Sequence, residues 1–257
     1  MSSIRGFFFD QDGVIIDTER DGHRVAFNRA FHELGLPARW DVDLYGELLK
    51  IAGGKERLRH FLRTPGSGAP VAPGTEDELI ARLHERKTDI FIEMLESGGL
   101  PLRPGVRRLM EEINRKGLVL GVCTTSDARV ALAVTTTILR GIRFDFVLAG
   151  DVVTRKKPDP EIYRLALHKA GLRAGECIVI EDSQIGIEAA KDAGLFVVAT
   201  PNGYTAKEDL SRADIVVSSL GDPGGETGKL LCGSIAGSRR QYDGVLRLDQ
   251  LVERFGS

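Results

Sequence analysis

The chain has 257 residues, of which 42% are hydrophobic and 28% are charged, and its formal net charge is −2. These values are typical of a globular protein with one large domain or two unequal ones. The charge lacks the basic excess of nucleic-acid-binding proteins, and no apolar stretch is long enough to span a bilayer. The N-terminus has no signal-peptide pattern, so we expect a cytoplasmic monomer, although a removed transit peptide would leave no trace.

The first predicted element is a strand over residues 4–10, and the long segment after it is helical. Residues 18–98 contain no convincing strand. Helical patterns cover 20–35, 41–50, 54–63 and 76–97, with a loop rich in Gly and Pro at 64–75. We therefore expect a helical cap of residues 18–98 that is inserted into a core of residues 1–17 and 99–257.

Beyond the insert, short apolar runs alternate with helical patterns. The runs are continuously apolar, which is typical of parallel strands covered on both faces. Strands that alternate with helices predict a doubly wound parallel sheet of the α/β class, similar to a Rossmann fold. The predicted strands are 118–124, 144–150, 177–182, 195–200 and 214–219, and the predicted helices are 104–117, 160–171 and 183–194.

The last part of the chain is less regular. Residues 221–244 are rich in glycine, and we expect a surface excursion without an assigned role before a final helix at 245–255. The three cysteines are few and widely spaced. Cys123 and Cys177 lie in predicted strands, where buried reduced thiols are expected.

Polar side chains follow the carboxyl ends of four predicted strands. In open parallel sheets, binding sites lie beyond these ends, so the four segments should meet at one edge. They carry Asp10 and Asp12 after the first strand, Thr124, Thr125 and Ser126 after the second, Asp151, Lys156 and Lys157 after the third, and Glu181, Asp182 and Ser183 at the fourth.

The gathered acids need a compensating charge. Two unit charges about 4 Å apart interact by about 4 kcal/mol at a protein surface. Mg²⁺ is a hard cation that binds carboxylates together with a substrate phosphate, and a lysine can hold a phosphoryl oxygen. In such a site Asp10 can attack phosphorus, and Asp12 can protonate the leaving oxygen and then activate water.

Each motif alone has a simpler interpretation. Asp-x-Asp-Gly is often a turn or part of a calcium loop, Lys157 before Pro158 suits a solvated loop, and Glu181-Asp182 can cap a helix. Their shared position at successive strand ends favours the catalytic interpretation.

The ordered motifs resemble the haloacid dehalogenase-like hydrolase superfamily. "FFFDQDG", "VCTTS", "KKPDP" and "IEDSQIGIEAAKDAG" are similar to its four motifs, and the helical insert is similar to its cap. The resemblance implies that Asp10 is the nucleophile and Asp12 the general acid/base, that Thr124 and Lys157 contact phosphate, and that Asp10, Asp12 (through its backbone carbonyl), Glu181 and Asp182 bind Mg²⁺.

Two cap stretches, "DTERDGHRVAFN" and "WDVDLYGELLKIAGGKER", resemble the CbbY-type branch, the xylulose-1,5-bisphosphate phosphatases. The resemblance implies that Glu19, His23, Lys55 and Arg57 contact the substrate. The open amides of Gly53 and Gly54 beside Lys55 suit a second phosphate. Alternatively, Lys55 and Arg57 merely solvate a helix start while His23 packs or pairs locally.

We therefore expect a Mg²⁺-dependent phosphatase that acts on a small phosphorylated sugar through an aspartyl-phosphate. One alternative is a phosphosugar mutase of the β-phosphoglucomutase kind, which shares these motifs and differs in the acceptor. An alternative of another class is a phosphoacceptor receiver domain, which also combines strand-end acids, a hydroxyl and a lysine but lacks a helical insert.

Overall fold

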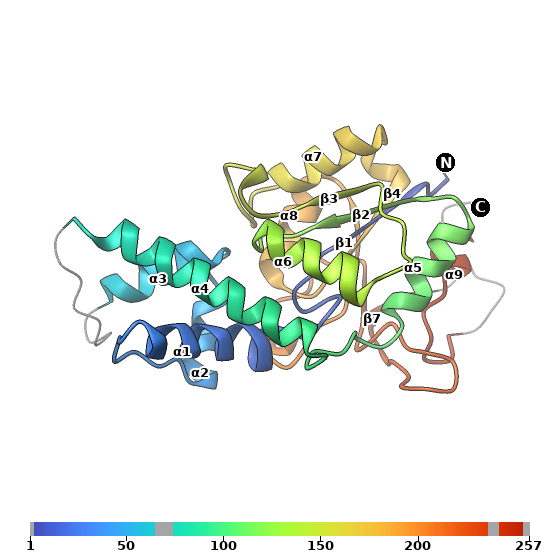
Figure 1. Ribbon diagram of the computed structural model, residues 1–257. Coiled ribbons are helices and arrows are strands. Elements are labelled where there is room, and N and C mark those ends of the chain that lie inside the picture. Colours follow the sequence, from blue (N-terminus) through green and yellow to red (C-terminus); the bar gives the residue numbers. More distant parts are fainter. Residues whose placement is uncertain (1–2, 65–73, 236–241, 254–257) are drawn as a thin grey trace.

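The computed structural model describes residues 3–64, 74–235 and 242–253 (Figure 1). Its centre is a sheet in the order β3-β2-β1-β4-β5-β6-β7, and all neighbouring strands are parallel except the pair β6 and β7. Strand β1 is central, with Phe9 aligned to Val122 on one side and to Ile180 on the other. The strands are β1 (Gly6–Phe9), β2 (Val119–Cys123), β3 (Phe146–Leu148), β4 (Cys177–Glu181), β5 (Phe196–Ala199), β6 (Ile215–Val217) and β7 (Leu230–Gly233).

The three phenylalanines of β1 are fully buried because helices cover both faces of the sheet. Successive side chains of a strand point to opposite faces. Phe7 and Phe9 pack in the cluster that includes α5 (Val106–Arg115), α6 (Ala128–Ala133) and α9 (Leu248–Glu253), while Phe8 packs with α7 (Glu161–Ala170) and α8 (Gln184–Asp192). Strand β1 is thereby anchored from both sides, and Asp10 follows it directly.

The segment between β1 and α5 forms a helical unit beside the sheet, seen in blue and cyan in Figure 1. Its helices pack around Trp40, which is fully buried against Phe27, Phe31 and Phe61. This arrangement supports the proposed division into a cap of residues 18–98 and a core. The elements are η1 (Glu19–His23), α1 (Arg24–Glu33), α2 (Val42–Leu48), α3 (Gly54–Arg63) and α4 (Glu76–Glu96).

Short helical turns complete the core: η2 (Val134–Ile138), η3 (Gly150–Val152), η4 (Ala174–Glu176) and η5 (Thr205–Lys207). The doubly wound parallel sheet is confirmed, and all six predicted strands are present with shorter bounds. In the described part of the chain, no helix is both long and apolar enough to cross a membrane.

The prediction for residues 221–244 was wrong in one respect, because part of this stretch extends the sheet. Strand β7 pairs with β6 in the antiparallel direction, although its four residues are exposed. An exposed edge strand lacks the continuous apolar run that marked the buried strands, so its sequence resembled a loop. Cys123 and Cys177 are buried free thiols, whereas Cys232 is exposed on β7. Most of the predicted loop at 64–75, the stretch 236–241 and the chain end after residue 253 lie outside the described residues.

Candidate active site

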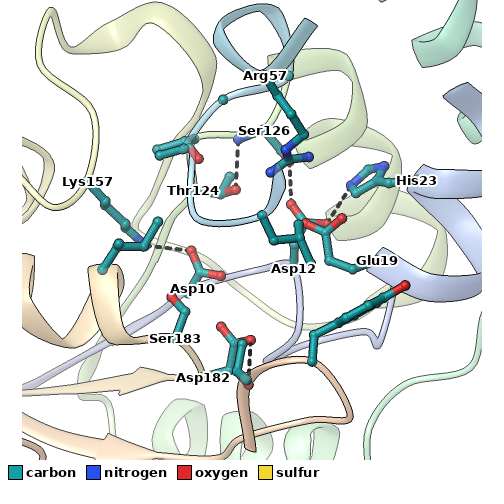
Figure 2. A pocket seen from close by; sticks show the side chains of 18 of the residues that line it. Asp10, Asp12, Glu19, His23, Arg57, Thr124, Ser126, Lys157, Asp182 and Ser183 are labelled. Atoms are coloured by element: carbon teal, nitrogen blue, oxygen red, sulfur yellow. Dashed lines mark hydrogen bonds and ion pairs between the residues drawn. The ribbon is translucent and has the colours of Figure 1, made fainter. Parts of the chain in front are cut away.

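A cavity of about 360 Å³ lies where the carboxyl edge of the sheet faces the cap (Figure 2). Twelve of the predicted site residues supply part of its wall, from both sides. Those from the core are Asp10, Asp12, Thr124, Thr125, Ser126, Lys157 and Asp182, and those from the cap side are Glu19, His23, Gly53, Gly54 and Arg57.

Lys157 connects two of the acids at the bottom of the cavity. Its Nζ donates to Asp10 Oδ1 and to Glu181 Oε1, both at 2.6 Å, and to the carbonyl of Cys123 at 3.1 Å. Tyr163 also donates to Glu181 Oε1, at 2.5 Å. Because the lysine is buried between two carboxylates, they raise its pKa despite desolvation, and it stays charged.

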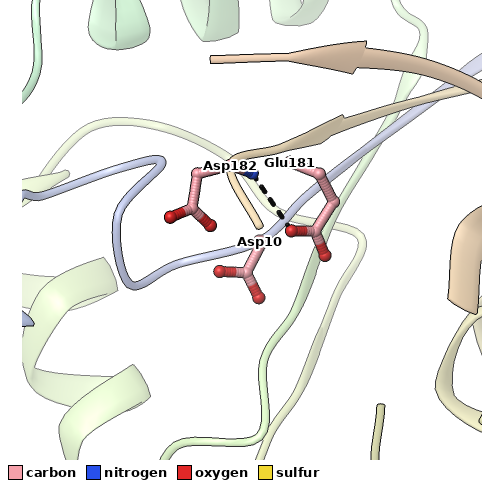
Figure 3. Close-up of side chains that lie close together, drawn as sticks. All are labelled: Asp10, Glu181 and Asp182. Carbon is pink, nitrogen blue, oxygen red and sulfur yellow. Dashed lines mark hydrogen bonds between the residues drawn. The ribbon is translucent and has the colours of Figure 1, made fainter. Parts of the chain in front are cut away.

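Asp182 completes the acidic group. Ligand oxygens of Asp10, Glu181 and Asp182 all lie within 4.8 Å of one another (Figure 3). The amide of Asn202 donates to Asp182 Oδ2 at 2.7 Å. Glu181 is fully buried behind Lys157 and does not line the cavity, so Asp10 and Asp182 are the carboxylates that face the open space.

These acids fit a hard divalent cation. Burial raises the pKa of both Asp10 and Asp182, and nearby carboxylates add to this effect. Lys157 at Asp10, and Arg103 with Lys157 at Asp182, oppose the rise only in part. Three buried carboxylates share one lysine, so a cation among their oxygens would relieve the crowding. Oxygen donors of this kind suit Mg²⁺, which Asp10 and Asp182 would hold with Glu181 behind them.

Asp12 points away from this acidic group and toward the cap. Its carboxylate accepts hydrogen bonds from Thr18 Oγ1 at 2.7 Å, from His23 Nε2 at 2.9 Å and from Ser126 Oγ. Burial alone would raise the pKa of Asp12, but His23 and these hydrogen bonds outweigh it and lower the pKa. Asp12 is therefore placed for proton transfer on the cap side of Asp10, and its side chain lies outside the acidic group.

On the cap side, Tyr45 connects two predicted substrate residues. Its hydroxyl donates to Glu19 Oε2 at 2.5 Å and accepts from Arg57 Nη1 at 3.1 Å. Arg57 also donates to the carbonyls of Leu48 and Ile51. The simpler interpretation that Arg57 solvates a helix start is wrong, because its side chain is buried and holds the cap backbone.

Lys55 is placed differently from the other predicted cap residues. It lines an adjoining cavity of about 340 Å³ that shares Gly54 and Thr125 with the first. Its Nζ lies 3.1 Å from Asp151 Oδ2, and Lys156 Nζ lies 3.3 Å from the other oxygen of Asp151. The two lysines thus share one exposed carboxylate where the cap meets the core.

Several residues of the cavity were not anticipated from the sequence. Lys87 on α4 is buried beneath the rings of Phe27 and Phe91, with its Nζ 4.9 and 5.4 Å from the ring centroids. Asn202 follows a predicted strand, so the strand-end rule could have found it, but no local signal marks the helical residue Lys87. The unanticipated wall residues also include Lys50, His84, Asp127, Gln184, Tyr204, Thr205 and Glu208.

Comparison with known proteins identifies the family to which this chain is similar. Residues 4–194 match the family model of the haloacid dehalogenase-like hydrolases. The chain is 46% identical over 239 residues to a CBBY-like protein of Arabidopsis thaliana, which covers 91% of this chain and 74% of the relative. It is 39% identical over 238 residues to protein CbbY of Cereibacter sphaeroides, which covers 91% of this chain and all of the relative.

Solved structures of related proteins are also similar to this chain. The crystal structure of CbbY from Rhodobacter sphaeroides in complex with phosphate matches with a TM-score of 0.78 and 39% identity, covering 84% of this chain and 94% of that one. A β-phosphoglucomutase from Clostridium difficile matches with a TM-score of 0.67 and 26% identity, covering 84% and 91%. The chain therefore belongs to the haloacid dehalogenase-like hydrolase family, within which it is a CbbY-like phosphatase, an enzyme and not a receiver domain.

Proposed function

We propose that the protein is a Mg²⁺-dependent phosphatase of a small sugar bisphosphate, with xylulose-1,5-bisphosphate as its substrate, and that the reaction passes through an aspartyl-phosphate on Asp10. One observation carries this proposal: Asp10 lies in the cavity wall with Lys157 Nζ 2.6 Å from its Oδ1 and with Asp182 in the same acidic group.

The proposed reaction has two steps. An Asp10 oxygen attacks phosphorus, and the bond from phosphorus to the sugar oxygen breaks. Asp12, whose carboxylate takes up a proton when the negatively charged substrate binds, gives that proton to the leaving oxygen. Asp12 then takes a proton from water, which attacks the aspartyl-phosphate and releases phosphate and free Asp10. Lys157 and Thr124 hold phosphoryl oxygens, and bound Mg²⁺ would supply further positive charge to the transferring group.

Two observations support a bisphosphate. The cap side of the cavity carries Lys50, Arg57 and Lys87, and the adjoining cavity carries Lys55 and Lys156, so positive side chains other than Lys157 line both cavities. In addition, a crystal structure of a mutant CbbY from Rhodobacter sphaeroides, 39% identical to this chain, is a complex with xylulose-1,5-bisphosphate.

The test is a phosphate-release panel of mono- and bisphosphorylated sugars, with Mg²⁺ or with EDTA. We expect the fastest release from xylulose-1,5-bisphosphate and none in EDTA. Equal rates in EDTA would contradict the metal dependence. Conversion of a sugar monophosphate into its isomer, with a bisphosphate primer and without net phosphate release, would favour the mutase. A monomer stays a prediction that sedimentation can check.

A further inference from the structure

Arg103 lies in the segment that returns from the cap to the core, shortly before α5. This segment runs beside the outgoing segment that follows β1. Leu102 forms a β-bridge with Ile16, and the backbone amide of Arg103 donates to the carbonyl of Ile15 at 3.0 Å. The backbone of Arg103 thus joins the two segments, and its side chain makes separate contacts in the core.

The guanidinium of Arg103 holds three further segments of the core together. Nη1 donates to the carbonyl of Thr200 at 2.6 Å, to its hydroxyl at 2.9 Å and to the carbonyl of Gly13. Nη2 donates to the carbonyls of Pro201 at 2.9 Å and Ser218 at 3.4 Å. The planar, always charged guanidinium can serve several carbonyls at once, which a lysine cannot do in the same geometry.

Two of these segments lead directly to Asp182. Asn202, which donates to Asp182 Oδ2 at 2.7 Å, follows Pro201 in the chain. Gly13 packs against the same pair, because a Cβ at this position would overlap both the carboxylate of Asp182 and the amide of Asn202. Arg103 therefore holds the backbone on both sides of Asp182, although it does not line the cavity itself.

We propose that Arg103 is a positioning residue for the metal site, which keeps Gly13 and Asn202 on Asp182 and thereby directs this carboxylate toward the cation. The inference rests on the Mg²⁺-dependent function proposed above. Arg103 lies in the segment that returns from the cap to the core. Its hydrogen bonds therefore connect this segment to the residues that surround Asp182.

The test measures metal binding directly, without turnover. Mn²⁺ binding to the full chain is followed by electron paramagnetic resonance of the free ion, with Mg²⁺ as competitor. We expect Arg103→Met to weaken binding about tenfold or more, as is usual when a residue that orients a metal ligand is lost. Arg103→Lys should weaken binding less, because it keeps the charge but cannot hold all the carbonyls.

Arg108→Met is the matched control. Arg108 on α5 also donates to backbone carbonyls, those of Gly221 and Leu246 at 2.9 Å. Like Arg103 it lies outside the cavity wall, but none of its hydrogen bonds in the described part of the chain goes to Gly13 or to residues 200–202. This variant should lose stability and keep the Mn²⁺ affinity of the wild type. The double variant of Arg103→Met and Asn202→Ala should weaken binding by less than the two effects combined, because both act through Asp182.

The outcomes separate this inference from the proposed function. Arg103 variants that bind Mn²⁺ as tightly as the wild type would overturn the inference, and so would full additivity with Asn202→Ala. If Arg103→Met fails to fold, the affinity of Arg103→Lys decides. A wild-type protein that binds no Mn²⁺ and still releases phosphate in EDTA would instead contradict the metal dependence itself.

Discussion

The two sides of the cavity hold their charges in different ways. On the core side, the side chain of Lys157 is 5% exposed and lies between two buried carboxylates at strand ends. On the cap side, the side chain of Lys55 is 42% exposed and shares Asp151 with Lys156. Buried pairs are screened little by solvent, whereas exposed pairs are weak and exchange partners easily.

The core side carries the groups proposed for the chemical step, and the cap side carries those proposed for substrate binding. On the core side, Asp10 directly follows β1 and Glu181 ends β4, and because these strands are neighbours in the sheet, the geometry of the two acids is rigid. The cap side depends on helices and on the contact between the cap and the core. We therefore expect core substitutions to abolish turnover and cap substitutions to change affinity or stability.

The largest effect should come from Asp10→Asn. Removal of the nucleophile should lower kcat by on the order of 10⁴-fold or more. The fold should survive, because the change removes one of three crowded carboxylates and leaves Lys157 with Glu181. Phosphate release and thermal unfolding of the same preparation check both statements. Turnover like that of the wild type would disprove the covalent step.

Asp12→Asn should have the next largest effect on turnover. Loss of a general acid/base costs about 10²- to 10⁴-fold in rate. The loss in the first step should be smaller for p-nitrophenyl phosphate, whose leaving group needs no proton, than for a sugar phosphate. Single-turnover rates with both substrates measure this difference. An equal loss in that step with both substrates would argue against proton donation by Asp12.

Lys87→Met should increase stability, in contrast to the core changes. Burial lowers the pKa of Lys87 to about 8, against an ordinary value of 10.5. Between these pH values the unfolded chain binds more protons, so the free energy of unfolding rises with pH across this window, and the cost of burial is complete below about pH 8.

The Lys87→Met variant should therefore be more stable at pH 7 by about 2 to 3 kcal/mol, and the gain should vanish above about pH 10.5. Urea unfolding from pH 7 to pH 10.5 measures it. Lys169→Met, at an exposed position of α7, is the control and should show no such gain. A difference between Lys87→Met and the wild type that does not change with pH would contradict the effect of burial.

The smallest effect on stability should come from Asp151→Asn. Exposed ion pairs contribute less than about 1 kcal/mol, so the unfolding temperature should hardly change. Lys55 loses its partner, whereas Lys156 keeps Glu56, whose Oε1 lies 3.1 Å from its Nζ. The freed Lys55 should bind a second phosphate better, and KM for a bisphosphate should fall several-fold. The matched control is Asp89→Asn, which breaks the exposed pair of Asp89 with Arg129, 2.8 Å apart, and should leave KM unchanged. An unchanged KM in Asp151→Asn would show that Lys55 does not bind the substrate.

Much of the core could be predicted because its signals are local. A buried parallel strand is continuously apolar, and the residue after it lies at the carboxyl edge of the sheet. This rule alone places Asp10, Thr124 and Asp182 at the wall of one cavity. Strand β7 escaped the rule because it is an exposed antiparallel edge.

The cap side could not be predicted in the same way. The pattern of a helix shows which residues can share a face, but not what that face meets after the helix docks. The helical pattern therefore did not predict that Lys87 is buried in the cavity wall, and Tyr45 gave no sign that it connects Glu19 with Arg57. The resemblance in the cap predicted substrate contacts for Glu19 and Arg57. It did not predict that the phenol of Tyr45 lies between them.

The sequence by itself determined the order of strands and helices and the acids and lysine at the strand ends, because these depend on neighbours along the chain. Only the tertiary structure decided that Asp12 turns toward His23, that Lys55 shares Asp151 with Lys156, and that Arg103 reaches three separate loops. These contacts join segments far apart in the chain, and their geometry follows from how the cap and its linkers pack on the sheet.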